Sequence, residues 1–190
     1  PFMCGIVGIF AKNDIGKLNF SNLRNAVQAL HFRGPDSKGI YYDEKIGLGH
    51  TRLSIIDTSN AAKQPFSSPN QRYILVFNGE IYNYKTLRKT LERKGYSFQT
   101  TSDTEVLLFH LIEFGESGIH DLNGFFGFAF YDKETKKTIV ARDRFGIKPL
   151  HVYEDENQLI FASELKAIFS FDITKKINYS SLQLYFKFNY

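Results

Sequence analysis

Segments with strand and helix patterns occur in separate groups along this chain, and that grouping constrains its fold more than any other feature. Apolar or aromatic runs bounded by turn residues predict strands at residues 4–10, 39–42, 46–56, 72–78, 96–101, 125–131, 138–142, 149–154 and 158–162. Helical spacing of apolar residues predicts helices between these groups, at residues 19–32, 84–94, 103–114 and 163–169. Neighbouring strands with short polar connections favour antiparallel sheets, so we expect an α+β fold and not a doubly wound parallel sheet.

The first predicted strand carries an unusual cysteine. The run Met3-Cys4-Gly5-Ile6-Val7-Gly8-Ile9-Phe10 holds the only cysteine and the only methionine of the 190 residues. If Met3 is the initiator, its removal leaves Cys4 with a thiol and a free α-amine. A thiol ionises near ~8.5 and an α-amine near ~7.7–8.0, so the amine can act as base for the thiol at neutral pH. The alternative is a buried strand in which Cys4 is simply a small apolar side chain.

The composition is that of a globular protein with a substantial core. Hydrophobic residues make up 43% of the chain and aromatic residues 16%, which excludes a disordered protein. One cysteine excludes an internal disulfide framework and suits a reducing, cytoplasmic location, and no apolar run is long enough to span a bilayer. The net charge of +4 forms no basic stripe, so we expect neither a nucleic-acid nor a membrane partner. The histidines lack the spacing of metal ligands, so we expect no metal site.

The tripeptide Asn78-Gly79-Glu80 directly follows an apolar strand. Asn and Gly are frequent turn formers, so a turn that ends the strand is the structural interpretation. The functional interpretation is an oxyanion hole, because the side-chain amide of Asn78 and the backbone N–H of Gly79 can converge on one oxygen. The missing Cβ of Gly79 would let a substrate approach that N–H.

Arg52 and Asp103 are candidates for recognition of an amino acid. Arg52 stands in an otherwise apolar strand, and Asp103 opens a helix after Ser102. Each residue also has a structural interpretation, as an arginine that faces solvent and as a first-turn acid favoured by the helix dipole. Placed together, the guanidinium would bind a carboxylate and the acid would accept an ammonium group.

Six segments occur together in a characteristic order: Met3-Cys4-Gly5-Ile6-Val7-Gly8, Arg33-Gly34-Pro35-Asp36, Arg52-Leu53-Ser54-Ile55, Asn78-Gly79-Glu80-Ile81-Tyr82-Asn83, Ser102-Asp103-Thr104-Glu105 and Ala141-Arg142-Asp143-Arg144-Phe145-Gly146. Together they resemble the class II glutamine amidotransferase domain, of the type that leads glutamine-hydrolysing asparagine synthetases. The resemblance covers Met3 to about Phe169. It implies the N-terminal nucleophile hydrolase fold, an αββα sandwich of two antiparallel sheets between helix layers.

The resemblance also implies a role for each candidate residue. Cys4 would be the nucleophile, and Asn78 and Gly79 would form the oxyanion hole. Arg52 would hold the carboxylate of L-glutamine, and Asp103 its α-amine. The same substrate pocket would be lined by Leu53, Ser54, Ile55, Ile56 and Glu80. The implied reaction is hydrolysis of the glutamine side-chain amide to glutamate and ammonia through a cysteine thioester, with no cofactor in this domain.

The resemblance further implies how the chain is divided. Residues 1–3 would be a vector remnant and the initiator methionine, residues 4–170 the glutamine amidotransferase domain, and residues 171–190 the start of a linker. The linker would lead to a synthetase domain that this sequence lacks. That C-terminal domain would be the partner that binds ATP and Mg²⁺, and a homodimer remains open.

The sequence departs from the family at Phe32. The family usually has His directly before the Arg-Gly-Pro-Asp turn, whereas here His31 is displaced by one position. Three functions therefore stay open: a glutaminase that supplies ammonia for asparagine, the same glutaminase serving a sugar or surface polysaccharide, and a non-catalytic homologue that binds glutamine or a partner. The presence of every candidate catalytic and binding residue argues against the third.

Overall fold

The computed structural model describes residues 3–53 and 63–189, and in them the strands form two antiparallel sheets. The first sheet has the strand order β2-β3-β1-β9-β8, and the second has the order β4-β5-β6-β7. The strand bounds are β1 Gly5–Ala11, β2 Ser37–Tyr42, β3 Ile46–Arg52, β4 Phe66–Ser67, β5 Tyr73–Ile81, β6 Gly124–Asp132, β7 Lys137–Arg142, β8 His151–Glu154 and β9 Gln158–Ala162.

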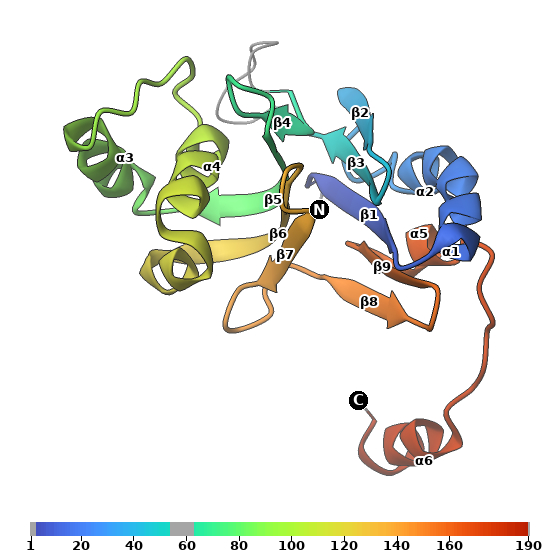
Figure 1. Cartoon of the computed structure of the whole chain (residues 1–190). Coiled ribbons are helices and arrows are strands. Elements are labelled where there is room, and N and C mark those ends of the chain that lie inside the picture. Colours follow the sequence, from blue (N-terminus) through green and yellow to red (C-terminus); the bar gives the residue numbers. More distant parts are fainter. Residues whose placement is uncertain (1–2, 54–62, 190) are drawn as a thin grey trace.

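Helices cover the outer faces of both sheets (Figure 1). On the first sheet lie α2 (Leu23–Ala29) and α5 (Leu165–Ile168), and on the second lie α3 (Tyr84–Arg93) and α4 (Asp103–Phe114). The remaining helical segments are α1 Asp14–Leu18, η1 Asn19–Asn22, η3 Gly115–Asp121 and α6 Tyr179–Phe188. The layers run helix, sheet, sheet, helix, which confirms the predicted αββα sandwich. None of the helices in the described ranges is long and apolar enough to cross a membrane.

Side-chain alternation explains why each sheet is covered on both faces. In β1, Ile6 packs into the core between the sheets, with Leu48 of β3 and Val76 of β5. The neighbouring Val7 and Ile9 belong to a separate cluster with the residues of α2 and α5. Because successive side chains of a strand point to opposite faces, a strand that is apolar at consecutive positions needs cover on both sides.

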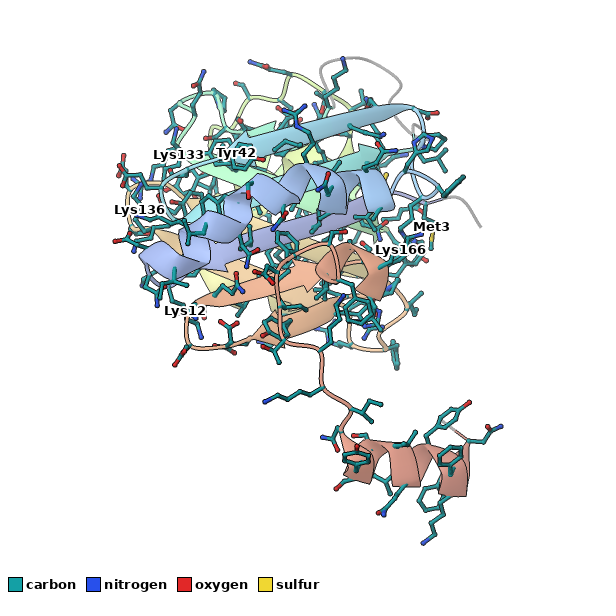
Figure 2. All side chains as sticks on the ribbon, turned by 90° about the vertical axis from the view of Figure 1, so that its right-hand side faces the viewer. Met3, Lys12, Tyr42, Lys133, Lys136 and Lys166 are labelled. Carbon is teal, nitrogen blue, oxygen red and sulfur yellow. The ribbon has the colours of Figure 1, made fainter. Side chains whose placement is uncertain are left out.

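The two ends of the sandwich are built differently. Figure 2 shows α2 lying across the outer face of the first sheet, with Met3 at one end of the sandwich and Lys136 at the other. At the Lys136 end, the ammonium group pairs with the carboxylate of Asp43 at 3.1 Å, which joins the β6–β7 turn to the β2–β3 turn. At the Met3 end, the residues around the start of β1, the end of β3 and the second half of β5 border a cavity.

The predicted turn at residues 78–80 is wrong, because β5 continues through them to Ile81. Gly79 lies opposite Phe126 of β6 in the strand register. A Cβ on Gly79 would lie 2.2 Å from the carbonyl oxygen of Phe125. Glycine therefore allows a close approach of two backbones here, and ladder pairing carries the strand past a dipeptide that forms turns elsewhere.

The predicted strand at residues 96–101 is also wrong. The carboxylate of Glu105 accepts hydrogen bonds from the backbone N–H groups of Gln99 at 2.9 Å and Thr100 at 2.7 Å. These donors are thus satisfied by a side chain and not by a neighbouring strand. Ser102 caps α4, since its Oγ accepts a hydrogen bond from the N–H of Glu105 at 3.4 Å.

Other predicted boundaries shift. The helix predicted at residues 19–32 is a 3₁₀ turn followed by α2, which ends at Ala29. The strand predicted at residues 46–56 is observed as β3 up to Arg52, and its last residues lie outside the described ranges. Ser163 does not cap α5, because its Oγ accepts a hydrogen bond from the N–H of Ile6 at 3.0 Å and so fixes β1.

Phe161 provides a test of the core between the sheets. Its ring is fully buried and packs against Gly8, where an added Cβ would lie 2.2 Å from it. Phe161→Ala should lower the free energy of unfolding by about 3–5 kcal/mol, because the lost ring leaves a cavity. Val152, its partner in the register, is 57% exposed, so Val152→Ala is the matched control.

The control should change the free energy of unfolding by about 0.5 kcal/mol or less. Urea unfolding measures both variants. Equal losses of stability in the two would contradict this assignment of the core.

Candidate active site

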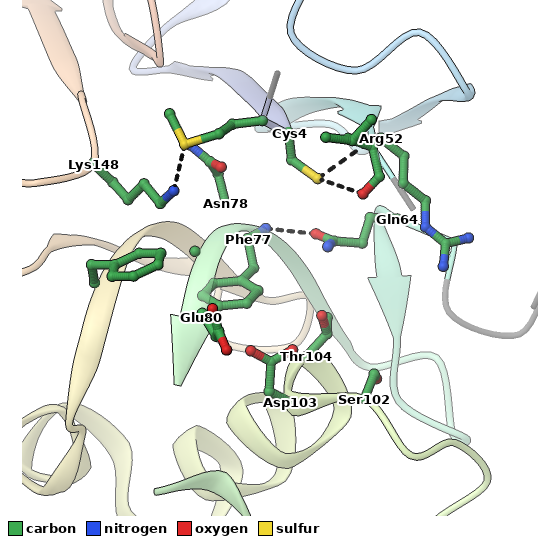
Figure 3. A pocket seen from close by; sticks show the side chains of 14 residues that line it. Cys4, Arg52, Gln64, Phe77, Asn78, Glu80, Ser102, Asp103, Thr104 and Lys148 are labelled. Atoms are coloured by element: carbon green, nitrogen blue, oxygen red, sulfur yellow. Dashed lines mark hydrogen bonds between the residues drawn. The ribbon is translucent and has the colours of Figure 1, made fainter. Parts of the chain in front are cut away.

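A cavity of about 330 Å³ opens at the Met3 end of the sandwich (Figure 3). The predicted site residues that line it are Cys4, Arg52, Leu53, Asn78, Gly79, Glu80 and Asp103. The remaining three, Ser54, Ile55 and Ile56, lie outside the described residues. The structure thus brings together groups from the start of β1, the end of β3, the second half of β5 and the start of α4.

Cys4 stands directly before β1, with its thiol against the backbone of Leu53. The sulfur accepts a hydrogen bond from the N–H of Leu53 at 3.3 Å, and the thiol donates to the Leu53 carbonyl oxygen at 3.5 Å. Burial raises the pKa of the Cys4 thiol, while the Leu53 N–H and the charges of Arg52 and Lys148 act in the opposite direction. The thiol is therefore protonated at neutral pH, and its use as a nucleophile requires a base.

The turn at residues 33–36 fixes the backbone on both sides of the cavity. Nε of Arg33 donates a hydrogen bond to the carbonyl oxygen of Cys4 at 2.9 Å. Gly34 packs against β3 so closely that a Cβ would lie 2.5 Å from the carbonyl carbon of Arg52. The glycine in this motif therefore sets how closely the turn approaches the end of β3, and the arginine anchors the residue that carries the thiol.

Within residues 3–53 and 63–189, one edge of β5 has no neighbouring strand where it borders the cavity, because β4 pairs only with the first residues of β5. Side chains satisfy this edge instead. Oε1 of Gln64 accepts from the N–H of Phe77 at 2.6 Å, and Oδ2 of Asp103 accepts from the N–H of Ile81 at 3.0 Å. Gly79 lies midway between these donors, and alternate residues of a strand direct their N–H groups to the same edge. No residue of the described ranges supplies an acceptor for the Gly79 N–H, which faces the cavity.

Asn78 supplies a second unpaired donor beside the first. Its side chain is buried, and its amide Nδ2 has no hydrogen-bond partner among the described residues. Figure 3 shows the side chain of Asn78 reaching from β5 toward the side of the cavity that holds Lys148 and Cys4. A buried unpaired N–H group typically costs about 1–3 kcal/mol, and an oxygen of a ligand in the cavity would offset this cost. The cavity therefore holds two donors of the kind that an oxyanion hole needs.

Groups of opposite charge occupy different walls of the cavity. Arg52 lies on the β3 side, whereas Glu80 and Asp103 lie on the side of β5 and α4 (Figure 3). Burial raises the pKa of Asp103 to about 6, and the negative charge of Glu80 contributes to the shift. A cation placed beside Asp103 would favour its ionised form again. These walls suit a ligand that carries both a carboxylate and an ammonium group.

Gln64 and Lys148 also line the cavity, and neither residue was predicted from the sequence. Gln64 holds the backbone of Phe77, as described above, and Lys148 is 6% exposed. The sequence offers little to find them: Gln64 lies in a polar loop before Pro65, and Lys148 follows the last of the six motifs by two residues. The sequence around Gln64 and Lys148 has no feature that distinguishes them from polar residues that face solvent.

Comparison with known proteins identifies relatives over the whole chain. Residues 3–190 match the family model described as glutamine amidotransferase domain. Asparagine synthetase [glutamine-hydrolyzing] 1 of Bacillus subtilis is 42% identical over 190 residues, which are 99% of this chain and 30% of that protein. Asparagine synthetase B [glutamine-hydrolyzing] of Escherichia coli is 42% identical over 168 residues, which are 87% of this chain and 30% of that protein.

Solved structures show the same fold. Glutamine phosphoribosylpyrophosphate (PRPP) amidotransferase from B. subtilis, complexed with ADP and GMP, superposes with a TM-score of 0.69 at 26% identity, over 88% of this chain and 43% of that chain. A structure described as the allosteric regulatory enzyme of purine biosynthesis superposes with a TM-score of 0.68 at 25% identity, over 88% of this chain and 43% of that chain. The chain thus spans less than half the length of each relative named here.

Asp103 gives the protein a pH dependence of stability whose sign follows from its pKa. The folded-state pKa is raised to about 6 from the ordinary 3.8, so the folded state binds this proton more tightly than the unfolded state does. The stability that Asp103 contributes is greatest below about pH 4 and is lost as the pH rises through about 6. Asp103→Asn carries no charge but keeps an oxygen that can accept from the N–H of Ile81.

The Asp103→Asn variant should therefore gain about 2–3 kcal/mol of stability relative to the parent between about pH 4 and pH 7. Urea unfolding at a series of pH values, without added ligand, measures this difference. A difference that stays constant over the range would show that the carboxyl of Asp103 is not perturbed.

Proposed function

This chain belongs to the family of glutamine amidotransferase domains, and from that premise we propose that it hydrolyses the side-chain amide of L-glutamine to glutamate and ammonia. One observation supports this most strongly. The only thiol of the chain, on Cys4, borders the same cavity as two unpaired N–H donors, Nδ2 of Asn78 and the backbone N–H of Gly79. A nucleophile facing an anion-stabilising pair is what acyl transfer from an amide requires.

The charged walls would orient the substrate. The α-carboxylate of glutamine would bind the guanidinium of Arg52, and its α-ammonium would lie beside Asp103, with Glu80 near by. The raised pKa of Asp103 supports this placement, since the ammonium supplies the positive charge that the carboxyl otherwise lacks. With both ends held, the side-chain amide is directed toward Cys4 and the two donors.

The chemistry would begin with the α-amine that removal of Met3 creates. The amine takes the thiol proton, and the thiolate of Cys4 attacks the amide carbon of glutamine. The oxygen gains negative charge and accepts hydrogen bonds from Asn78 and Gly79. The C–N bond then breaks, the ammonium of Cys4 returns its proton to the leaving nitrogen, and ammonia departs from a glutamyl thioester.

Hydrolysis of the thioester would complete the cycle. Water attacks the thioester carbon while the α-amine of Cys4 takes one of its protons. The tetrahedral oxygen is again stabilised by the same two donors. The C–S bond breaks, the sulfur leaves as a thiolate and regains the proton from the amine, and glutamate is released. Atoms and charges balance with glutamine and water as the only reactants.

The proposal also includes an acceptor for the released ammonia. We propose that it serves an ATP-dependent synthetase domain of the asparagine synthetase type, where ATP and Mg²⁺ would bind. The support is the identity of 42% to two glutamine-hydrolysing asparagine synthetases, of which this chain spans 30%. The structural likeness to a PRPP amidotransferase, at 26% identity, is the observation that favours another acceptor, and the lower identity makes it the second candidate.

The proposed base predicts that the residues before Cys4 control activity. While Met3 is attached, the nitrogen of Cys4 is an amide without a basic lone pair, and Met3 itself lines the cavity. Protein that begins at Cys4 should hydrolyse glutamine about 10²–10⁴ times faster than protein that keeps Met3, because base assistance is restored. Ammonia release measures the rate, and intact mass confirms each N-terminus.

Cys4→Ser in the protein without Met3 is the control for the nucleophile, since the chain has no other thiol. It should remain folded by circular dichroism and lose nearly all ammonia release. Similar rates with and without Met3 would exclude the α-amine as the base. A Ser variant that stays active would exclude Cys4 as the nucleophile.

A further inference from the structure

Lys148 is a buried cation near Cys4, and it has no role in the proposed hydrolysis of glutamine. Its side chain lines the same cavity, and the residue is only 6% exposed. Its Nζ contacts Sδ of Met3 at 2.6 Å and lies 4.3 Å from the centre of the Phe125 ring (Figure 3). In the described part of the chain this sulfur is the only hydrogen-bonding partner of the ammonium group.

The backbone of Lys148 is held from two sides. The carboxylate of Asp143 accepts hydrogen bonds from the N–H groups of Ile147 at 2.9 Å and Lys148 at 3.0 Å. Nε of Arg142 donates to the carbonyl oxygen of Lys148 at 2.6 Å. These hydrogen bonds fix the backbone of Lys148, and its side chain packs against the ring of Phe125. The ammonium group is therefore held in the cavity.

The contact with Met3 locates the ammonium relative to the future α-amine. Met3 directly precedes Cys4, so the ammonium group lies no farther from the nitrogen of Cys4 than one methionine side chain plus this contact, and its charge also acts on the Cys4 thiol. Removal of Met3 takes away the sulfur partner of Lys148 and creates a basic amine at that nitrogen. Two amines then share one poorly solvated space, in which both cannot easily be protonated.

The charges that face Lys148 come from several elements. Burial lowers the pKa of Lys148 and the nearby positive charge of Arg33 adds to this, whereas Cys4, Glu80 and Asp143 act to raise it. The ordinary pKa of a lysine lies about two and a half units above that of an α-amine. An α-amine, with an ordinary pKa near ~7.7–8.0, gives up its proton first.

We propose that Lys148 is a positioning residue that sets the protonation state of Cys4, keeping its α-amine unprotonated and favouring its thiolate once Met3 has been removed. A nearby positive charge disfavours a second ammonium and favours an anion, so one side chain acts on both groups of Cys4 in the useful direction. The effect of Lys148 on catalysis rests on the proposed function, whereas the effect of Lys148 on the pKa of the Cys4 thiol does not.

The test uses protein that begins at Cys4, with Lys148→Met, which removes the charge, and Lys148→Arg, which keeps it. Lys148→Gln provides a second neutral side chain in case the Met variant folds poorly. Lys166→Met is the matched control, because Lys166 is also close to the Met3 end (Figure 2) but pairs with Glu164 at 2.7 Å. Two profiles are measured against pH: the rate of alkylation of Cys4 by iodoacetamide, and kcat/KM for glutamine hydrolysis.

Loss of the charge should move the midpoints of both profiles to higher pH by about one unit. At neutral pH the alkylation rate of the Met variant should fall by up to about tenfold. The Arg variant and the Lys166 control should keep the midpoints of the parent.

Unchanged midpoints in both neutral variants would overturn the proposal, even if their rates fall, because a purely structural role lowers a rate without moving a midpoint. If alkylation shifts as expected and none of the proteins hydrolyses glutamine, Lys148 tunes Cys4 but the proposed function is wrong. If hydrolysis occurs and neither profile moves, the function stands and the role of Lys148 is wrong.

Discussion

The site depends on the cavity-facing edge of β5, which pairs with no strand in the part of the chain that the structure describes. Backbone N–H and C=O groups must be paired or solvated, so the cavity-facing edge of β5 needs partners from elsewhere. The N–H of Phe77 donates a hydrogen bond to Oε1 of Gln64, and the carbonyl oxygen of Phe77 lies 3.2 Å from Nε2 of the buried His50. Asp103 takes the N–H of Ile81. Side chains thus close the edge on both sides of Gly79 and leave its N–H for a ligand.

The same arrangement explains why the cavity contains polar groups that are unfavourable without a ligand. Nδ2 of Asn78 is buried without a partner among the described residues, and burial raises the pKa of Asp103. A packed sandwich holds them in place, since Ser163 fixes β1 and Arg33 anchors the carbonyl oxygen of Cys4. Bound glutamine would provide the oxygen for Asn78 and the ammonium group for Asp103. Because the fold holds these residues in fixed positions, a ligand that carries both groups would bind best.

The sequence predicted the groups of strands and helices from local signals, and its resemblance to class II glutamine amidotransferases implied the αββα layers. Alternating apolar residues mark the strands, and short motifs mark Cys4, Arg52 and Asp103. It failed where distant residues decide the outcome. The turn predicted at residues 78–80 is a strand because β6 pairs with it, and the strand predicted at residues 96–101 is replaced by contacts to a glutamate. Lys148 was missed for the same reason, since its importance comes from a neighbour that is 145 positions away.

In the proposed reaction, the cavity-facing edge of β5 receives the oxygen of the reacting amide. A crystal structure of the protein beginning at Cys4, reacted with a glutamine analogue whose amide is replaced by an electrophilic ketone, tests this directly. We expect a bond from Cys4 to the former carbonyl carbon, with the oxygen within hydrogen-bond distance of both Nδ2 of Asn78 and the N–H of Gly79. An adduct on Cys4 whose oxygen points away from both donors would contradict it.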